Sequence, residues 1–244
     1  MRIQVINPNT SLAMTETIGE AARAAAAPGT EILAVCPSEG VPSIEGHFDE
    51  AIAALGVLEQ INAGRSAGVD GHIIACFGDP GLLAARELAR GPVIGIGEAA
   101  MHLATLVATR FSIVTTLPRT LIIARHLLSQ YGFTAHCAGL HAIDLPVLAL
   151  EDGTGLAQQK VREGCLQALR TDSCGAIVLG CGGMADLARE LTRELGVPVI
   201  DGVSAAVKMV ESLVGLGLST SKFGDLAWPE KKPLSGKFQL FSPY

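Results

Sequence analysis

Two stretches, Ile73-Ile74-Ala75-Cys76-Phe77-Gly78 and Ile177-Val178-Leu179-Gly180-Cys181-Gly182-Gly183, share one pattern, in which an apolar run ends at a cysteine and glycine follows within two residues. Short apolar runs rich in β-branched residues indicate buried strands, and glycine favours a tight turn. Each stretch is therefore predicted to be a strand whose carboxyl end carries a thiol, at a turn that leads into a helix. The chain contains the same half-site twice.

The two stretches belong to a longer internal repeat. Three pairs of landmarks are separated by 105 to 108 positions: Arg2 and Arg110, Cys76 and Cys181, and Pro92 and Pro198. Random alternation of strands and helices would not keep these distances. We therefore predict an α/β fold of two pseudo-symmetric units, each a parallel sheet flanked by helices and built with right-handed crossovers. The first unit comprises residues 1–97 with 204–244, and the second comprises residues 98–203.

Apolar and alanine-rich segments alternate within each unit. Strands are expected at residues 3–6, 31–35, 71–75, 92–96, 111–116, 135–139, 174–180 and 197–200. Helices are expected at about residues 11–27, 48–63, 82–89, 155–169 and 203–216, and after residues 98, 118 and 184. Residues 7–11 are predicted to form a turn and the N-cap of the first helix, and Asp79 is predicted to be an N-cap with Pro80 at the first helical position. The tail from Ser219 is expected to return to the first unit.

Ligands of parallel sheets bind beyond the carboxyl ends of the strands. Asn9, Cys76, Thr115 and Cys181 all fall at such ends. We therefore expect the active site in the cleft between the two units.

Composition bounds the class of protein. The 244 residues are 49% hydrophobic and 17% charged, with a net charge of -6, so there is no basic surface for nucleic acid. Apolar stretches such as residues 93–96 are too short to span a bilayer, and the first strand is not preceded by a basic region and a long apolar segment. We expect a cytoplasmic protein without nucleic-acid or membrane partners.

Six cysteines without a leader segment indicate free thiols rather than a disulfide framework. No CxxC pair or Cys/His cluster has the spacing of a zinc site. Cys36, Cys137, Cys165 and Cys174 are interpreted as small packed residues. Cys76 and Cys181 differ from these four because they occupy equivalent positions in the repeat.

Two thiols that face each other across a cleft could transfer protons at both faces of one carbon. A free thiol has a pKa of about 8.5, and a helix N-terminus is expected to lower it. Backbone amides of the glycines after each cysteine could hold a developing oxyanion. The main alternative interpretation of the two cysteines is a thiol-redox pair, although no CxxC motif supports it. The sequence has neither of the glycine motifs of nucleotide-binding loops, and no lysine near the two turns. A pyridoxal phosphate site would need a Schiff-base lysine, and only Lys160 and Lys208 lie outside the C-terminal tail.

Polar residues at the other strand ends are candidates for ligand contact or for capping the following helices: Asn7, Asn9, Thr10, Thr115 and Thr116. The loop of residues 42–47 is placed over the same end of the sheet and could close on a substrate. Within this loop, Glu45 and His47 are interpreted as surface or orienting groups rather than as bases.

Residues 7–11, 75–81, 179–184 and 198–202 together resemble the hydantoin racemase branch of the aspartate/glutamate racemase superfamily. The resemblance runs from residue 1 to about 215, and with the tail at residues 228–232 it is greatest to members that act on allantoin in purine catabolism. It implies two-base proton transfer at C5 of a hydantoin ring, with Cys76 and Cys181 as the acid/base pair.

The same resemblance implies further properties of the site. No metal and no cofactor are expected, the substrate is a small ureide or 5-substituted hydantoin, and the subunits form a homo-oligomer. The substrate would be held by Asn9, Ser43, Ile44, Phe77, Gly78, Thr115, Thr116, Gly182 and Gly183.

Related activities can be weighed against these residues. Acidic substrates need cations, yet only Arg119 accompanies the predicted strand ends, which favours a neutral ureide. Arylmalonate decarboxylases resemble the same fold but keep only the second cysteine, whereas maleate isomerases keep both and stay an alternative. A binding or thiol-redox protein on this fold is the alternative from another class.

Overall fold

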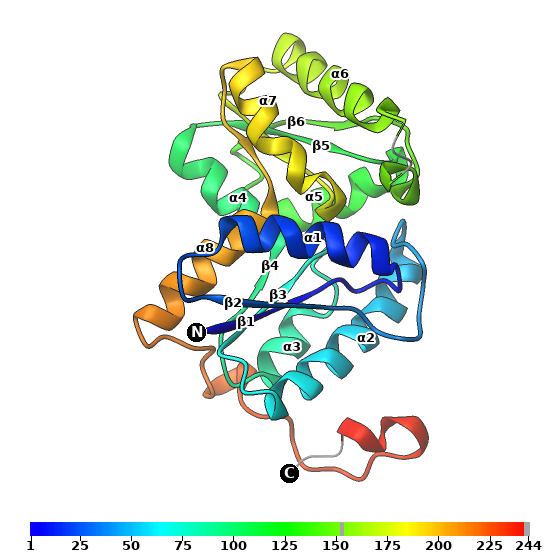
Figure 1. The fold of residues 1–244 in the computed structure, drawn as a ribbon, viewed down its shortest axis with the longest axis vertical. Coiled ribbons are helices and arrows are strands. Elements are labelled where there is room, and N and C mark those ends of the chain that lie inside the picture. Colours follow the sequence, from blue (N-terminus) through cyan, green and yellow to red (C-terminus); the bar gives the residue numbers. More distant parts are fainter. Residues whose placement is uncertain (152–153, 242–244) are drawn as a thin grey trace.

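The computed structural model describes residues 1–151 and 154–241 and consists of two four-stranded parallel sheets flanked by helices (Figure 1). The first sheet has the order β2-β1-β3-β4 and the second has the order β6-β5-β7-β8. Its strands are β1 Arg2–Ile6, β2 Glu31–Val35, β3 Gly71–Ile74 and β4 Val93–Gly95, followed by β5 Phe111–Thr115, β6 Cys137–Ala142, β7 Ala176–Leu179 and β8 Val199–Ile200. The equivalent orders confirm the predicted fold of two similar units.

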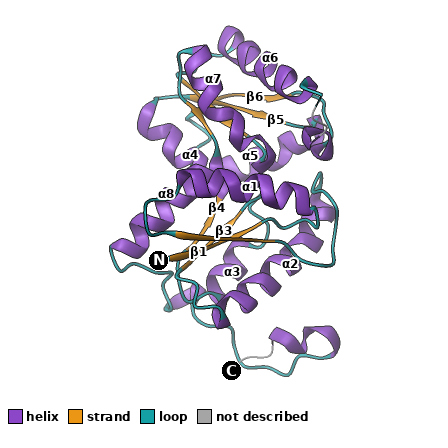
Figure 2. Cartoon of the chain, viewed as in Figure 1, coloured by secondary structure: helices purple, strands orange, loops and turns teal. Residues whose placement is uncertain are grey.

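Helices connect the strands and cover both faces of each sheet (Figure 2). They are α1 Leu12–Ala25, α2 His47–Ser66, α3 Leu82–Leu88, α4 Ile96–Val107, α5 Leu121–Gln130, α6 Leu156–Thr171, α7 Ala188–Leu195 and α8 Gly202–Gly215. Short 3-10 helices cover Pro118–Thr120, Val147–Glu151, Gly182–Leu187, Gly224–Leu226 and Gly236–Phe241. Across the described part of the chain, every helix is too short or too polar to cross a bilayer.

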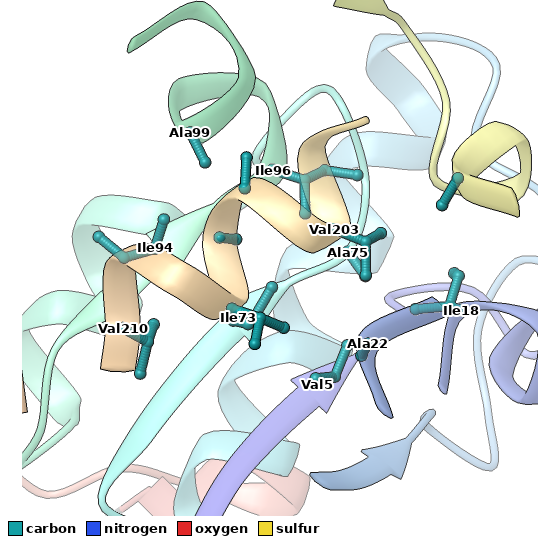
Figure 3. Close-up of a cluster of buried hydrophobic side chains, with 14 of the residues drawn as sticks. Val5, Ile18, Ala22, Ile73, Ala75, Ile94, Ile96, Ala99, Val203 and Val210 are labelled. Carbon is teal, nitrogen blue, oxygen red and sulfur yellow. The ribbon is translucent and has the colours of Figure 1, made fainter. Parts of the chain in front are cut away.

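Helix α8 follows the last strand of the second sheet but packs on the first. Its side chains Val203 and Val210 are fully buried against Val5 and Ile73 of the first sheet, with Ile18 of α1 in the same cluster (Figure 3). Burial of such aliphatic side chains stabilises the fold by roughly 2 kcal/mol each. The chain therefore leaves the first unit after β4 and returns to it with α8.

Helix α4 packs on the second sheet. Its residues Ala100, Met101 and Ala104 are fully buried with Phe111 of β5 and Val178 of β7. Helices α4 and α8 also contact each other, so the two crossings between the units run side by side. The boundaries at residues 97–98 and 203–204 stay a prediction that these contacts support.

Local signals predicted some element ends and missed others. Ser11 caps α1, because its side chain accepts a hydrogen bond from the amide of Met14. The prediction that Asp79 caps α3 is wrong, since Gly81 is the N-cap there, with φ of 73° and no side-chain hydrogen bond. Asp79 instead accepts from the amides of Gly97 and Glu98 and so caps α4. The strand expected at residues 135–139 lies two to three positions later, as β6.

The C-terminal tail returns to the first unit, as expected. The ammonium group of Lys222 donates to the backbone carbonyls of Arg86 and Glu87, at the end of α3. The same group lies 4.3 Å from the ring centre of Trp228, and the Arg65 guanidinium of α2 lies 5.5 Å from it. These contacts hold the tail against α2 and α3.

Candidate active site

A single pocket at the carboxyl ends of the two sheets contains both cysteines of the repeated motif. Cys76 lies two residues after β3, and Cys181 lies two residues after β7, at the start of the 3-10 helix Gly182–Leu187. The pocket is lined by Asn7, Asn9, Met14, Ile44, Glu50, Ala75, Cys76, Phe77, Gly78, Thr115, Thr116, Thr120, Ile123, Val147, Gly180, Cys181 and Gly182. Both units therefore contribute to one site.

Gly182 allows the two cysteine turns to meet. A Cβ atom at this position would lie 2.9 Å from the backbone carbonyl oxygen of Ala75 and 3.4 Å from the side chains of Ile18 and Ile96. A backbone oxygen cannot give way as a flexible side chain can. The turn after β7 thus approaches the end of β3 closely because it has no side chain there.

The surroundings disfavour the thiolate form of both cysteines. Burial raises the pKa of the Cys76 thiol far above its ordinary value and that of Cys181 to about 11. Hydrogen bonds from the backbone amides of Gly78 and Gly183 oppose these shifts. The expectation that a helix N-terminus lowers the two pKa values is thus wrong in its net sign, because burial outweighs the amides.

Carboxylates add to this effect on both thiols. The charges of Glu50 and Asp79 raise the pKa of Cys76, and those of Glu151 and Glu45 raise the pKa of Cys181. Both cysteines are nevertheless only partly buried as residues, since their side chains open into the pocket. Burial and the carboxylate charges together therefore favour the protonated form of both thiols near neutral pH.

A fixed asparagine pair forms the floor of the first half-site. The amide nitrogen of Asn7 donates to Oδ1 of Asn9 at 2.8 Å, and the same oxygen accepts from the backbone amide of Ser11 at 2.8 Å. These bonds orient the Asn9 side chain, whose Nδ2 lies 3.4 Å from the sulfur of Met14. A thioether is a weak acceptor, so Nδ2 keeps donor capacity for a ligand carbonyl.

The loop of residues 42–46 belongs to the first unit, lines the pocket with Ile44 and contacts the second unit. A Glu45 carboxylate oxygen accepts from the backbone amide of Val147 at 2.8 Å. Arg119 packs against Gly46, and the His47 ring stacks on His126 of α5 with 5.9 Å between ring centres. Glu45 thus orients the loop, as expected, and the loop delivers Ile44 to the pocket wall.

The chain matches a known protein family over most of its length. The model of the family described as Asp/Glu/Hydantoin racemase matches residues 3–210. The chain belongs to this family. It is therefore an isomerase that acts as a racemase.

Individual relatives match over nearly the whole chain. A hydantoin racemase of Pseudomonas sp. (strain NS671) is 45% identical over 99% of this chain and 97% of its own length. The solved structure of allantoin racemase from Klebsiella pneumoniae is 83% identical, covers 100% of both chains and has a TM-score of 0.99. Allantoin racemase from Pseudomonas fluorescens is 41% identical over 97% of this chain and 100% of its own, with a TM-score of 0.90.

The structure brings most of the predicted site residues of this racemase together. Nine of them line the pocket: Cys76, Cys181, Asn9, Ile44, Phe77, Gly78, Thr115, Thr116 and Gly182. Ser43 and Gly183 do not, although the Gly183 amide donates to the Cys181 thiol. The roles of all eleven stay predictions.

Other lining residues escaped the sequence reasoning. They are Met14, Glu50, Thr120, Ile123 and Val147, which come from helices or loops that only the tertiary fold brings to the strand ends. Of these, Glu50 had one available signal, its place in the first turn of the helix that follows the loop of residues 42–46.

The remaining cysteines lie away from the pocket lining. Cys165 is fully buried in the core of the second unit, and the Cys137 thiol contacts the carbonyl of Gly139. Among the described residues, no three His, Cys, Asp or Glu side chains are grouped as a metal ion would require.

Proposed function

We propose that this racemase interconverts (R)- and (S)-allantoin by proton transfer at C5 of the hydantoin ring, with Cys76 and Cys181 as the two bases. The observation that carries the proposal is one pocket lined by two cysteines at equivalent strand ends of two pseudo-symmetric units. The allantoin substrate is supported by the 83% identity to allantoin racemase from Klebsiella pneumoniae.

In one direction the thiolate of one cysteine removes the C5 proton, and the thiol of the other donates a proton to the opposite face. The reverse direction exchanges these roles, so the protonation states of the pair alternate and no cofactor is consumed. A thiol pKa of about 11 makes the Cys181 thiolate a strong base for a weak carbon acid.

Negative charge that develops on the ring carbonyl oxygen during this transfer needs donors. Gly182 and Asn9 line the pocket, and the backbone amide of the first and the Nδ2 group of the second can supply them. Ile44, Phe77, Thr115 and Thr116 would hold the remainder of the ring and the ureido group. Ser43 and Gly183 would act from behind the wall, the first through the loop and the second through its amide at Cys181.

The activity is tested by following the optical rotation of (R)- or (S)-allantoin in metal-free buffer with EDTA. We expect loss of rotation far above the spontaneous rate, with an equal mixture as the end point. Rotation that decays only at the rate of an enzyme-free control would refute the proposal.

The roles of the two thiols are tested by substitution. We expect Cys76→Ser and Cys181→Ser each to abolish racemisation, while a single variant in deuterated solvent exchanges the C5 proton of one enantiomer. Cys174→Ser, a cysteine outside the pocket lining, is the matched control and should retain activity. Full activity in either of the first two variants is incompatible with two-base transfer.

A second candidate is racemisation of other 5-substituted hydantoins, which is favoured by the hydantoin racemase of Pseudomonas sp. at 45% identity. The two candidates share one site and one chemistry. Comparison of kcat/KM for allantoin and for 5-alkyl hydantoins separates them.

We also propose a homo-oligomer. This proposal rests on the resemblance to racemases whose subunits associate, and the exposed side chains of Leu106 and Phe223 (80% and 89%) are compatible with it. Light scattering of the purified protein tests this, and a monomer across the concentration range would contradict it.

A further inference from the structure

A carboxylate lies in the wall of the catalytic pocket. Glu50 comes from the first turn of α2, its side chain is only 19% exposed, and it lines the pocket beside Gly78. A Cβ atom at Gly78 would lie 2.2 Å from Oε1 of Glu50, so the carboxylate occupies the space that a side chain would fill. Among the described lining residues, Glu50 is the single carboxylate and there is no Lys or Arg.

The two oxygens of Glu50 have different surroundings. Oε2 lies 3.2 Å from Nδ1 of His47, whereas Oε1 is the oxygen directed at Gly78 and the cysteine turn. The loop and the helix start are held by another residue, because Asp49 accepts the backbone amide of Glu45 at 2.9 Å. Oε1 is therefore available to accept a hydrogen bond from a ligand.

The electrostatic surroundings of the pocket are negative on both sides. Glu50 and Asp79 act on the Cys76 thiol, and Glu151 and Glu45 act on the Cys181 thiol. Burial raises the pKa of Glu50; the imidazoles of His47 and His126 act against this rise, and the charge of Asp49 adds to it. An anionic ligand thus meets like charge at both cysteines, and of these four carboxylates Glu50 is the one that lines the pocket.

Ureides present the opposite chemistry. A hydantoin ring and a ureido group carry several N–H donors and no charge, and each donor that leaves water needs an acceptor. A carboxylate oxygen is a strong acceptor for such groups and repels a carboxylate on the ligand.

We propose that Glu50 is the specificity-determining residue of the pocket, accepting an N–H of a neutral ureide through Oε1 and rejecting anionic ligands of the same shape. The inference rests on the proposed hydantoin racemisation and adds to it the class of C5 substituent that is accepted.

The test uses two substrates that differ in charge and hardly in size, hydantoin-5-acetamide and hydantoin-5-acetate. Racemisation of single enantiomers is followed at about pH 8, where the acetate side chain is ionised. The readout is the ratio of kcat/KM for the acetamide to kcat/KM for the acetate. In the unaltered protein we expect a ratio well above ten. Glu50→Gln keeps the shape and one acceptor oxygen but removes the charge, and we expect it to lower the ratio at least about tenfold, the effect of one pKa unit of charge interaction.

Glu59→Gln is the matched control, because it removes the same charge from α2 about 2.5 turns further along the helix and outside the pocket lining. We expect its ratio to equal that of the unaltered protein. If the ratio of kcat/KM for acetamide to acetate is unchanged in Glu50→Gln, or falls equally in Glu59→Gln, the role of Glu50 is overturned. Racemisation of the acetamide by the unaltered protein would in that case still support the proposed function. Absence of racemisation with both substrates and with allantoin in the unaltered protein overturns the proposed function and this inference together.

Discussion

Tyr131→Phe is expected to destabilise the protein in a pH-dependent manner. Tyr131 follows α5 of the second unit, and its hydroxyl donates to Oδ2 of Asp79 at 2.8 Å. The same carboxylate, only 5% exposed, accepts from the amides of Gly97 and Glu98 at 3.0 and 2.8 Å. The three bonds connect the cysteine turn of the first unit to α4 and to the second unit.

The sign of the pH dependence follows from the pKa of Asp79. Burial raises it to about 7, against the amide of Gly97, the hydroxyl of Tyr131 and the amide of Glu98, which lower it. Because the folded pKa exceeds the unfolded value of about 3.9, the native state binds the extra proton between these values, and stability falls as the pH rises through 7. Loss of the hydroxyl raises the folded pKa further, so the variant continues to lose stability above pH 7.

The magnitude depends on the charge that the hydroxyl supports. Near pH 5.5, where Asp79 is protonated, the variant loses a neutral hydrogen bond worth about 1 kcal/mol. Near pH 8.5, where Asp79 is ionised, it loses a bond to a charged group, worth about 2 kcal/mol. The phenyl ring keeps the packing that Tyr131 makes with the two adjacent cores.

Urea unfolding at both pH values, at one protein concentration, measures the two free-energy differences. In the Asp79→Asn background the effect of Tyr131→Phe should no longer depend on pH. A destabilisation that is equal at the two pH values in the unaltered background, or larger at pH 5.5, would refute the role of the Asp79 charge.

Three further predictions concern the turn, the thiols and the second unit. Gly182→Ala should lower kcat/KM at least about 100-fold, because the added Cβ would clash with the Ala75 carbonyl oxygen and a displacement of the reacting groups by about 1 Å has an effect of this size. Gly215→Ala is the control, because no atom lies near its Cβ position. Equal activity of the two variants would contradict the close approach of the two turns. The kcat/KM should rise about tenfold per pH unit up to at least pH 9, because burial raises the pKa of Cys181 to about 11 and the fraction of its thiolate grows tenfold per pH unit below that value. A plateau already at pH 8 in a pH–rate profile would show that a different group limits the reaction. Asp172→Asn should lower the free energy of unfolding by about 1 kcal/mol at pH 7. Burial acts to raise the pKa of Asp172, but hydrogen bonds from Ser112, His141 and Thr171 have the larger effect and lower it. Because the folded pKa lies below the unfolded one, the stability that the Asp172 carboxylate contributes is present above about pH 4 and disappears as the pH falls through the folded pKa. Urea titrations that show the same loss of unfolding free energy for Asp172→Asn near pH 2 as at pH 7 would contradict this.

The repeat was sufficient to predict the fold because each landmark lies at a strand end. Parallel strands buried on both faces have near-continuous apolar sequences; β7 follows this pattern throughout, and β3 is fully buried and follows it at Ile73 and Ile74. Strand β6 is half-buried throughout and contains Gly139 and His141, so its sequence gives a weaker signal and its position was missed by two to three residues. The capping role of Asp79 was missed because the helix it caps starts 17 residues later.

Prediction of the site was limited in the same way. Residues that follow a strand, such as Thr115 and Gly182, could be placed from their own segment. Glu50 and Val147 could not, since the loop of residues 42–46 and its bond to the second unit bring them to the pocket. The direction of the thiol pKa shifts also requires the fold, because desolvation depends on what surrounds the sulfur and the sequence shows only the glycine amides beside it.

The two half-sites have the same backbone plan but different chemistry. Burial raises the pKa of both thiols, but different carboxylates act on each of them. Two enantiomers have equal free energies in water, so the equilibrium constant of a racemase is one and its kcat/KM must be the same in both directions. Unequal thiols therefore cannot favour one enantiomer in kcat/KM. The two directions can differ in kcat and in KM, but both constants must then differ by the same factor. A substitution at Glu50 must obey the same constraint.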